Sequence, residues 1–146
     1  MKVWQKILLL VGLSLALAKV SLAADFSGFI ELKPNEVYQG RLEEKQPLRF
    51  VFTLTSKQEI VLESHTSQKR TNNVYPSGVL FTKEGRVLAR DWSSGLGRNF
   101  KIKRQLEAGT YVLRVEDERG CGSLHGCPEI LRDFELSFEV TEISPF

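Results

Sequence analysis

The side chains of this 146-residue sequence best suited to chemistry are two cysteines with a histidine between them. Cys121 and Cys127 stand in the segment CGSLHGC, which also contains His125. In an exported protein a close, even pair of cysteines is most simply a disulfide, and the flanking glycines suit a small ring. The alternative is zinc or copper bound by both cysteines and His125, but the spacing is not a standard zinc pattern and no fourth ligand is evident. We expect a Cys121–Cys127 disulfide, no metal and no cofactor.

Catalysis by a nucleophile requires a base close to a serine or cysteine. His65 and His125 are the two histidines, and neither lies in a recognisable nucleophile context such as G-x-S-x-G. We therefore expect no catalytic residue and no enzymatic activity.

A stretch rich in basic residues surrounds Trp92 in the segment DWSSGLG. One interpretation is a binding surface for an acidic or carbohydrate ligand or a protein. The alternative is that the basic side chains are solvated and balanced by neighbouring glutamates, and that Trp92 folds back over the open end of the fold. The candidate binding residues are Arg90, Trp92, Arg98, Lys101 and Lys103, with Arg86 and Arg104 in the same stretch.

Residues 1–23 have the features of a signal peptide: two early lysines, an apolar run over residues 7–18, and small residues in SLA at 21–23. The apolar run is too short to cross about 30 Å of hydrocarbon as a helix, which argues against a membrane anchor. We expect cleavage after Ala23 or Ala24, and export to the periplasm or the extracellular space. No transmembrane segment is expected in the mature chain.

Removing this leader changes the charge balance. The whole chain has a formal charge of +2, but three lysines lie in the leader, so residues 24–146 carry 17 basic and 18 acidic residues. A nearly neutral chain gives no reason to expect nucleic-acid binding. The remaining 123 residues are enough for one domain with a real core.

The pattern of the mature chain predicts strands. Residues 48–55 and 134–141 alternate apolar and polar side chains, and further strand-like runs lie at 58–64, 99–106 and 109–116. Residues 78–91 hold two apolar runs around KEG, which predicts a compact hairpin turn in which Gly85 can adopt a positive φ. No segment shows the apolar spacing of an amphipathic helix. Short strands joined by turn residues predict an all-β protein, a single antiparallel two-sheet β-sandwich. Within residues 85–115 the expected core residues are Val87, Leu88, Phe100, Ile102, Leu106, Tyr111, Leu113 and Val115.

In this order the segments resemble the bacterial pre-peptidase C-terminal domain. LEAGTY at 106–111 matches the family pattern L-x-A-G-T-Y, and GVLFTKEGRVLARD at 78–91 is similar to its glycine-containing hairpin. Weaker matches are YQGRL at 38–42, LRFVFTLTSKQEIVLES at 48–64 and FELSFEV at 134–140. The resemblance implies a secreted, jelly-roll-like sandwich.

Two features depart from that family. Asp91 is followed by Trp92 where the family often has paired acidic residues, and no carboxylate cluster matches the calcium sites of some members. The family usually stands at the tail of a secreted protease, whereas here we expect a free-standing version.

Two polar loops, at 64–78 and 118–133, are longer than the strands require, and binding residues concentrate on such loops. We therefore expect an exported, non-catalytic binding module that recognises a polysaccharide or a protein through loops at one end of the sandwich. The alternatives are a structural or accessory envelope protein that docks on a larger assembly and a small metal-binding periplasmic protein.

Overall fold

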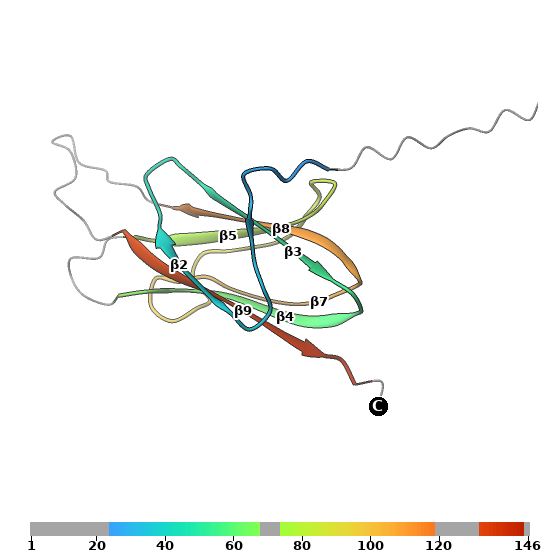
Figure 1. The fold of residues 1–146 in the computed structure, drawn as a ribbon. Helices are drawn as coiled ribbons and strands as arrows, with labels where there is room; N and C mark the ends of the chain where they lie inside the picture. Colours follow the sequence, from blue (N-terminus) through green and yellow to red (C-terminus); the bar gives the residue numbers. More distant parts are fainter. Residues whose placement is uncertain (1–23, 68–73, 119–131, 145–146) are drawn as a thin grey trace, which may run out of the picture.

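The computed structural model describes residues 24–67, 74–118 and 132–144. Within them the chain forms strands and turns without a helix, and two sheets pack face to face (Figure 1). The predicted two-sheet β-sandwich is confirmed. The strands are β1 (Ile30–Glu31), β2 (Val37–Arg41), β3 (Leu48–Leu54), β4 (Gln58–Thr66), β5 (Pro76–Thr82), β6 (Val87–Asp91), β7 (Lys101–Leu106), β8 (Gly109–Asp117) and β9 (Asp133–Glu142).

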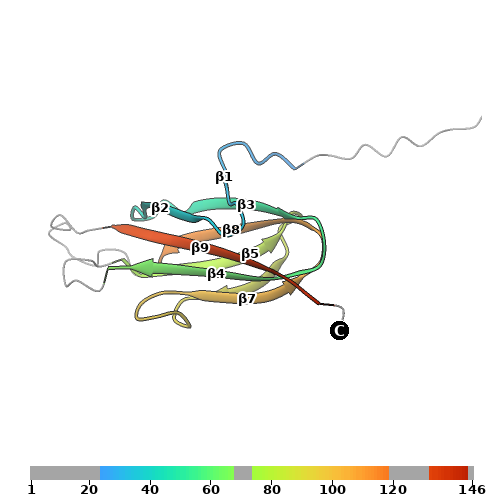
Figure 2. The same cartoon turned by 60° about the horizontal axis from the view of Figure 1, so that its bottom comes forward.

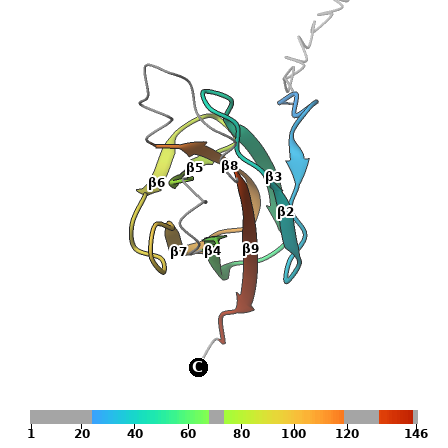
Figure 3. The ribbon, with the colours of Figure 1, turned by 90° about the vertical axis from the view of Figure 1, so that its left-hand side faces the viewer.

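The order of strands is β1-β3-β8-β5-β6 in the five-stranded sheet and β2-β9-β4-β7 in the four-stranded sheet. Neighbouring strands are antiparallel, except that the short β1 runs parallel to β3, with Ile30 opposite Phe50. Viewed along the strands, the two layers leave β6 beside β7 on one side and β3 beside β2 on the other (Figure 3). The chain therefore crosses between sheets at β6–β7, where the sequence had placed Trp92.

Period-two alternation accounts for the core. On β3 the side chains of Phe50, Phe52 and Leu54 are buried, while those between them face outward. The ring of Phe52 stacks on Tyr111 of its own sheet at 5.6 Å and meets Phe138 of the other sheet at 4.6 Å, measured between centroids. Phe52 thus joins both layers, as the alternating pattern predicts.

Most of the core predicted within residues 85–115 is confirmed, but Val87 is not part of it. Its side chain is 39% exposed. The pairing of β5 with β6 shifts between Leu80 and Phe81, so that Phe81 lies opposite Val87 and Leu88 is the extra residue. Such a bulge reverses which side chains of a strand face inward. Leu88 packs against the core, and Val87 lies on the outer face.

The compact turn predicted between β5 and β6 is confirmed. Gly85 has a φ of 87°, and its N–H donates to the carbonyl oxygen of Thr82 at 2.9 Å. A positive φ is readily adopted by glycine, which explains the residue at this place in the turn.

Four connections lie at one end of the sandwich, which we call the loop end. β2, β4, β6 and β8 end there, and β3, β5, β7 and β9 begin there (Figures 1 and 2). The register places Arg41 opposite Asp133, Thr66 opposite Phe134, and Pro76 opposite Asp117. The long polar loops and the Trp92 segment therefore leave the sandwich at the same end.

The predicted leader, the two cysteines and His125 lie outside the described residues. Across the ranges given above, no helix is long and apolar enough to cross a membrane.

Candidate functional site

Residues 92–98, in the segment between β6 and β7, are all described, whereas the connections that follow β4 and β8 are described only in part. We call residues 92–98 the tryptophan loop. Asp91 holds it at its start. One carboxylate oxygen of Asp91 accepts the N–H groups of Ser94 at 3.0 Å and Lys101 at 2.9 Å, and the other accepts the Ser94 hydroxyl at 2.6 Å. The loop is therefore closed by one side chain that binds both of its arms.

The same contacts set the acidity of Asp91. Partial burial acts to raise the pKa of its carboxyl group, but hydrogen bonds from the Ser94 hydroxyl and from the N–H groups of Lys101, Ser94 and Ser93 outweigh it. The pKa is lowered from its ordinary value of 3.8. Asp91 is thus held as a carboxylate, the form that accepts these hydrogen bonds.

Asn99 fixes the end of the loop from inside the fold. Its side chain is buried, donating to the Leu96 carbonyl at 2.8 Å and to the Thr66 hydroxyl at 3.2 Å. Its amide oxygen accepts the buried Ser64 hydroxyl at 3.0 Å. The loop is therefore anchored to β4, and its backbone is braced at both ends.

Two large apolar side chains project from this braced loop. Trp92 is 61% exposed and Leu96 is 75% exposed. Trp92 therefore does not cover the open end of the sandwich, and the interpretation of this residue as a lid is wrong. Exposed apolar side chains on a restrained loop can be buried against a partner with little loss of backbone entropy.

The structure separates the basic residues that lie near Trp92 in the sequence. Arg90 faces outward from the five-stranded sheet, opposite Val79. Lys101 and Lys103 face outward from the four-stranded sheet. The sequence cluster is therefore distributed over two different faces.

The two lysines are balanced by neighbouring glutamates, as the alternative interpretation expected. Lys101 Nζ lies 3.0 Å from Glu63, and Lys103 Nζ lies 3.1 Å from Glu59. Both lysine side chains are exposed while their glutamate partners are partly buried, and ion pairs near the surface contribute little, about 0–1 kcal/mol each.

Arg98 connects the tryptophan loop to the neighbouring connection. Its guanidinium carbon lies 4.5 Å from the ring centroid of Tyr75, just before β5. A cation over an aromatic face contributes about 0.5–1 kcal/mol at an exposed site. Of the predicted site residues, Trp92 and Arg98 therefore share the loop end.

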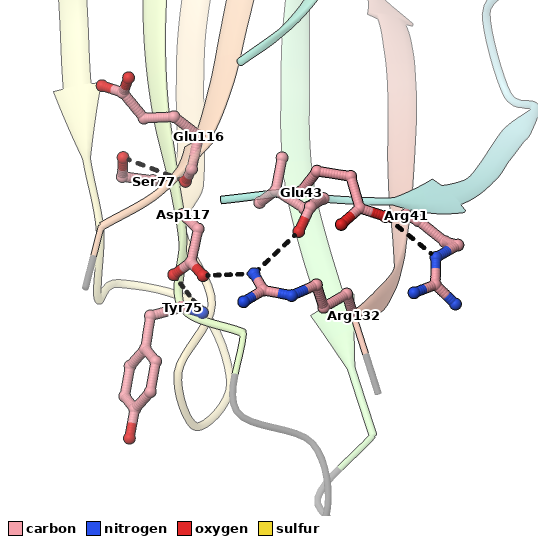
Figure 4. A network of polar contacts seen from close by, with 8 residues as sticks. Arg41, Glu43, Tyr75, Ser77, Glu116, Asp117 and Arg132 are labelled. Atoms are coloured by element: carbon pink, nitrogen blue, oxygen red, sulfur yellow. Dashed lines mark hydrogen bonds and ion pairs between the residues drawn. The ribbon is translucent and has the colours of Figure 1, made fainter. Parts of the chain in front are cut away.

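A buried ion pair at the loop end was not predicted from the sequence. Arg132 Nη1 lies 3.3 Å from a carboxylate oxygen of Asp117 and 3.4 Å from the Leu42 carbonyl (Figure 4). Asp117 also accepts the Tyr75 N–H at 3.2 Å. These contacts tie together the end of β8, the start of β9 and the residues that flank them. The sequence signal that could have indicated this ion pair is the position of Asp117 and Arg132, one at each end of the long loop between β8 and β9.

A shallow depression of about 580 Å³ lies beside the loop end, on the outer face of the four-stranded sheet. It is lined by polar side chains that include Gln39, Arg41, His65 and Glu135. His65 Nε2 lies 3.2 Å from the Ser137 hydroxyl. In the described part of the chain, no group of three or more His, Cys, Asp or Glu residues could hold a metal ion. The Ser137 hydroxyl also donates to the Glu63 carbonyl at 3.3 Å, so the depression offers several hydrogen-bonding groups.

Comparison with known proteins finds similarity in fold. No protein-family model matches the chain, and no curated protein matches its sequence. The pre-peptidase C-terminal domain of a collagenase from Bacillus anthracis superposes with a TM-score of 0.56 at 15% identity, covering 75% of this chain and 93% of that one. A periplasmic inhibitor of g-type lysozyme from Aeromonas hydrophila gives a TM-score of 0.56 at 11% identity, covering 77% and 96%. The resemblance drawn from the sequence motifs is therefore confirmed for the fold.

Proposed function

We propose that this chain is an exported, non-catalytic binding module whose tryptophan loop inserts into a protein partner. The observation that carries the proposal is the 61% exposure of Trp92 on a loop that Asp91 and Asn99 brace. Trp is enriched among the residues that dominate binding energy at protein interfaces, and preorganisation lowers the cost of ordering a loop.

Leu96 favours a protein over a polysaccharide as the partner. A sugar ring stacks on an aromatic face, but it offers little to an aliphatic side chain that is 75% exposed four residues away. Two apolar side chains on a projecting loop fit an apolar recess in a protein surface. Arg98, stacked on Tyr75, adds a positive charge at the edge of this contact.

The solved structures are compatible with this proposal. One is a domain of a collagenase, and the other is a periplasmic inhibitor of g-type lysozyme, which acts on a protein. The leader-like residues 1–23 support export. If the chain is instead an accessory protein of a larger envelope assembly, the same loop serves as its docking element.

The test is affinity capture from an envelope extract with the immobilised full chain, together with a glycan array. Trp92→Ala and Leu96→Ala should each abolish capture of the same protein partner. The matched control is Val37→Ala, which truncates an apolar side chain that is 56% exposed at the opposite end of the sandwich. Val37→Ala should capture that protein as the wild type does.

Thermal melts make the result interpretable. Trp92→Ala should change the free energy of unfolding by no more than about 0.5 kcal/mol, because the side chain lies at the surface. A Trp92→Ala variant that still binds its partner would refute the proposal. Hits on the glycan array that depend on Trp92, without any protein partner, would assign the loop to a polysaccharide instead.

A further inference from the structure

Three arginines form a row across the outer face of the five-stranded sheet. Arg49 on β3 lies directly opposite Arg114 on β8. Val79 on β5 is opposite Arg114 on one side and Arg90 of β6 on the other. Because each residue lies directly opposite the next, the row runs straight across four adjacent strands, which are about 4.8 Å apart. We call these three residues the arginine row.

The row carries more positive charge than its surroundings neutralise. Like charges directly opposite each other on paired strands are destabilising, as for Arg49 and Arg114. Among the described residues Arg49 and Arg90 make no ion pair, and Arg114 makes one, with Glu116 at 3.4 Å. The Nε atom of Arg114 is buried and has no hydrogen-bond partner in this part of the chain. Because that atom is out of reach of solvent, the donor capacity of the row for an anion lies mainly with the exposed Arg49 and Arg90.

A hollow of about 310 Å³ adjoins the row and adds an apolar wall. Arg49, Arg114 and Lys83 line it together with Phe29 and Phe81. The Arg114 guanidinium lies over the Phe81 ring, 5.6 Å from its centroid. Positive charges thus stand beside two aromatic side chains on an open face.

The acidic residue in the lining of this hollow, Asp25, hydrogen-bonds within its own segment. Asp25 stands at its rim, and its carboxylate accepts the Ser27 N–H at 2.9 Å. No ion pair joins Asp25 to Arg49 or Arg114 in the described chain. The Arg49 guanidinium is therefore open to an anion from outside, whereas the Arg114 guanidinium also contacts Glu116.

We propose that the arginine row binds a linear acidic polysaccharide. Carboxylate or sulfate groups along the polymer pair with successive guanidiniums, since the guanidinium fork matches planar oxyanions. A sugar ring lies against the aromatic wall of the hollow. A straight row on an open sheet suits an extended polymer, whereas a small anion would engage only part of it. This site goes beyond the proposed function, because it lies on a sheet face and not on the tryptophan loop.

Binding of the full chain to polygalacturonate and dextran sulfate, with neutral dextran as the reference, tests this proposal. We expect binding to both acidic polymers that weakens as salt rises, and none to dextran. Arg49→Gln and Arg90→Gln should each lower the affinity about tenfold, as loss of a charge-assisted hydrogen bond predicts. The matched control is Arg104→Gln, which removes an exposed arginine from the four-stranded sheet and should bind as the wild type does.

Several results would overturn the proposal. An equal loss in Arg104→Gln would show that net charge alone attracts the polymers. Tighter binding of poly-glutamate than of either polysaccharide would assign the row to an acidic peptide, and binding of neither polymer would remove the site. Trp92→Ala should bind both polymers normally, so failure of this site and failure of the loop proposal give different results.

Discussion

Ser64 and Asn99 form a buried hydrogen bond, with 3.0 Å between the Ser64 hydroxyl oxygen and the Asn99 amide oxygen. The same hydroxyl accepts a hydrogen bond from the N–H of Phe100 at 3.1 Å, so it acts both as a donor and as an acceptor. Because the amide nitrogen of Asn99 reaches Leu96, the pair links β4 to the tryptophan loop. The exposed side chains of the loop are thus positioned by polar groups in the interior.

Asn99→Ala should destabilise the protein and loosen the tryptophan loop. The substitution removes three hydrogen bonds and leaves the buried Ser64 hydroxyl without its acceptor, which predicts a loss of about 1–3 kcal/mol in the free energy of unfolding. Urea unfolding measures the loss, and hydrogen exchange of the loop amides measures the loosening. Gln39→Ala, which removes an exposed hydrogen bond to Glu135, is the control and should change stability little. Unchanged exchange in Asn99→Ala would show that the loop is held by other contacts.

Gly78 and Phe100 should show strong energetic coupling. A methyl group at Gly78 would come within 2.8 Å of ring carbons of Phe100. Gly78→Ala should therefore cost about 1–3 kcal/mol by overpacking. Phe100→Ala should cost about 3–5 kcal/mol, because the ring is fully buried.

The double variant distinguishes this contact from two independent defects. With Phe100 truncated, the methyl group at position 78 no longer clashes, so the combined loss should be smaller than the sum of the two single losses. Urea unfolding of the four proteins provides the cycle. Additive losses would contradict direct contact between the two sites.

Acid should release the Asp91 contacts. The pKa of Asp91 in the folded protein lies below its ordinary value of 3.8, so its stabilisation is complete at neutral pH. As the pH falls below 3.8 and through the lower pKa of the folded state, the Asp91 carboxylate is protonated and its stabilisation of the fold is lost. The backbone amides of Ser94 and Lys101 should therefore show NMR shifts that titrate with a midpoint below 3.8. Asp91→Asn should abolish this titration, and a midpoint above 3.8 in the wild type would contradict the assigned hydrogen bonds.

The Cys121–Cys127 bridge stays a prediction from the sequence, because both residues lie outside the described chain. Intact-mass analysis without reductant should find a mass lower by two hydrogens than that of the reduced chain. Replacing both cysteines by serine should cost less than the roughly 3 kcal/mol of a fifteen-residue loop, because the closed ring is short. Two free thiols, or stoichiometric bound metal, would favour the metal-binding alternative.

The sequence predicted those features that depend on local pattern. Alternation identified β3 and β9, and the position of Gly85 identified the turn between β5 and β6. Val87 was misassigned to the core because a bulge depends on pairing with β5, which no local pattern records. The arginine row was missed for a related reason: Arg49, Arg90 and Arg114 are distant in sequence and become neighbours only through strand register.

Polar residues of the interior escaped prediction as well. Asn99 begins one predicted strand and Ser64 ends another, and both are residue types that are common in loops. Only the tertiary structure shows that they are buried against each other. Conversely, adjacency in the sequence grouped Lys101 and Lys103 with Trp92, although alternation turns the two lysines toward glutamates on the neighbouring strand.

The bulge that exposes Val87 also limits self-association. β6 is the outer strand of its sheet, and a register shift interrupts the even spacing of backbone groups that a second copy would need for pairing. β7 is the outer strand of the other sheet on the same side, and it carries Lys101 and Lys103. If the β7 edges of two copies paired, the lysines of one copy would lie close to those of the other. Both strands on this side are therefore poor templates for growth into a continuous intermolecular sheet.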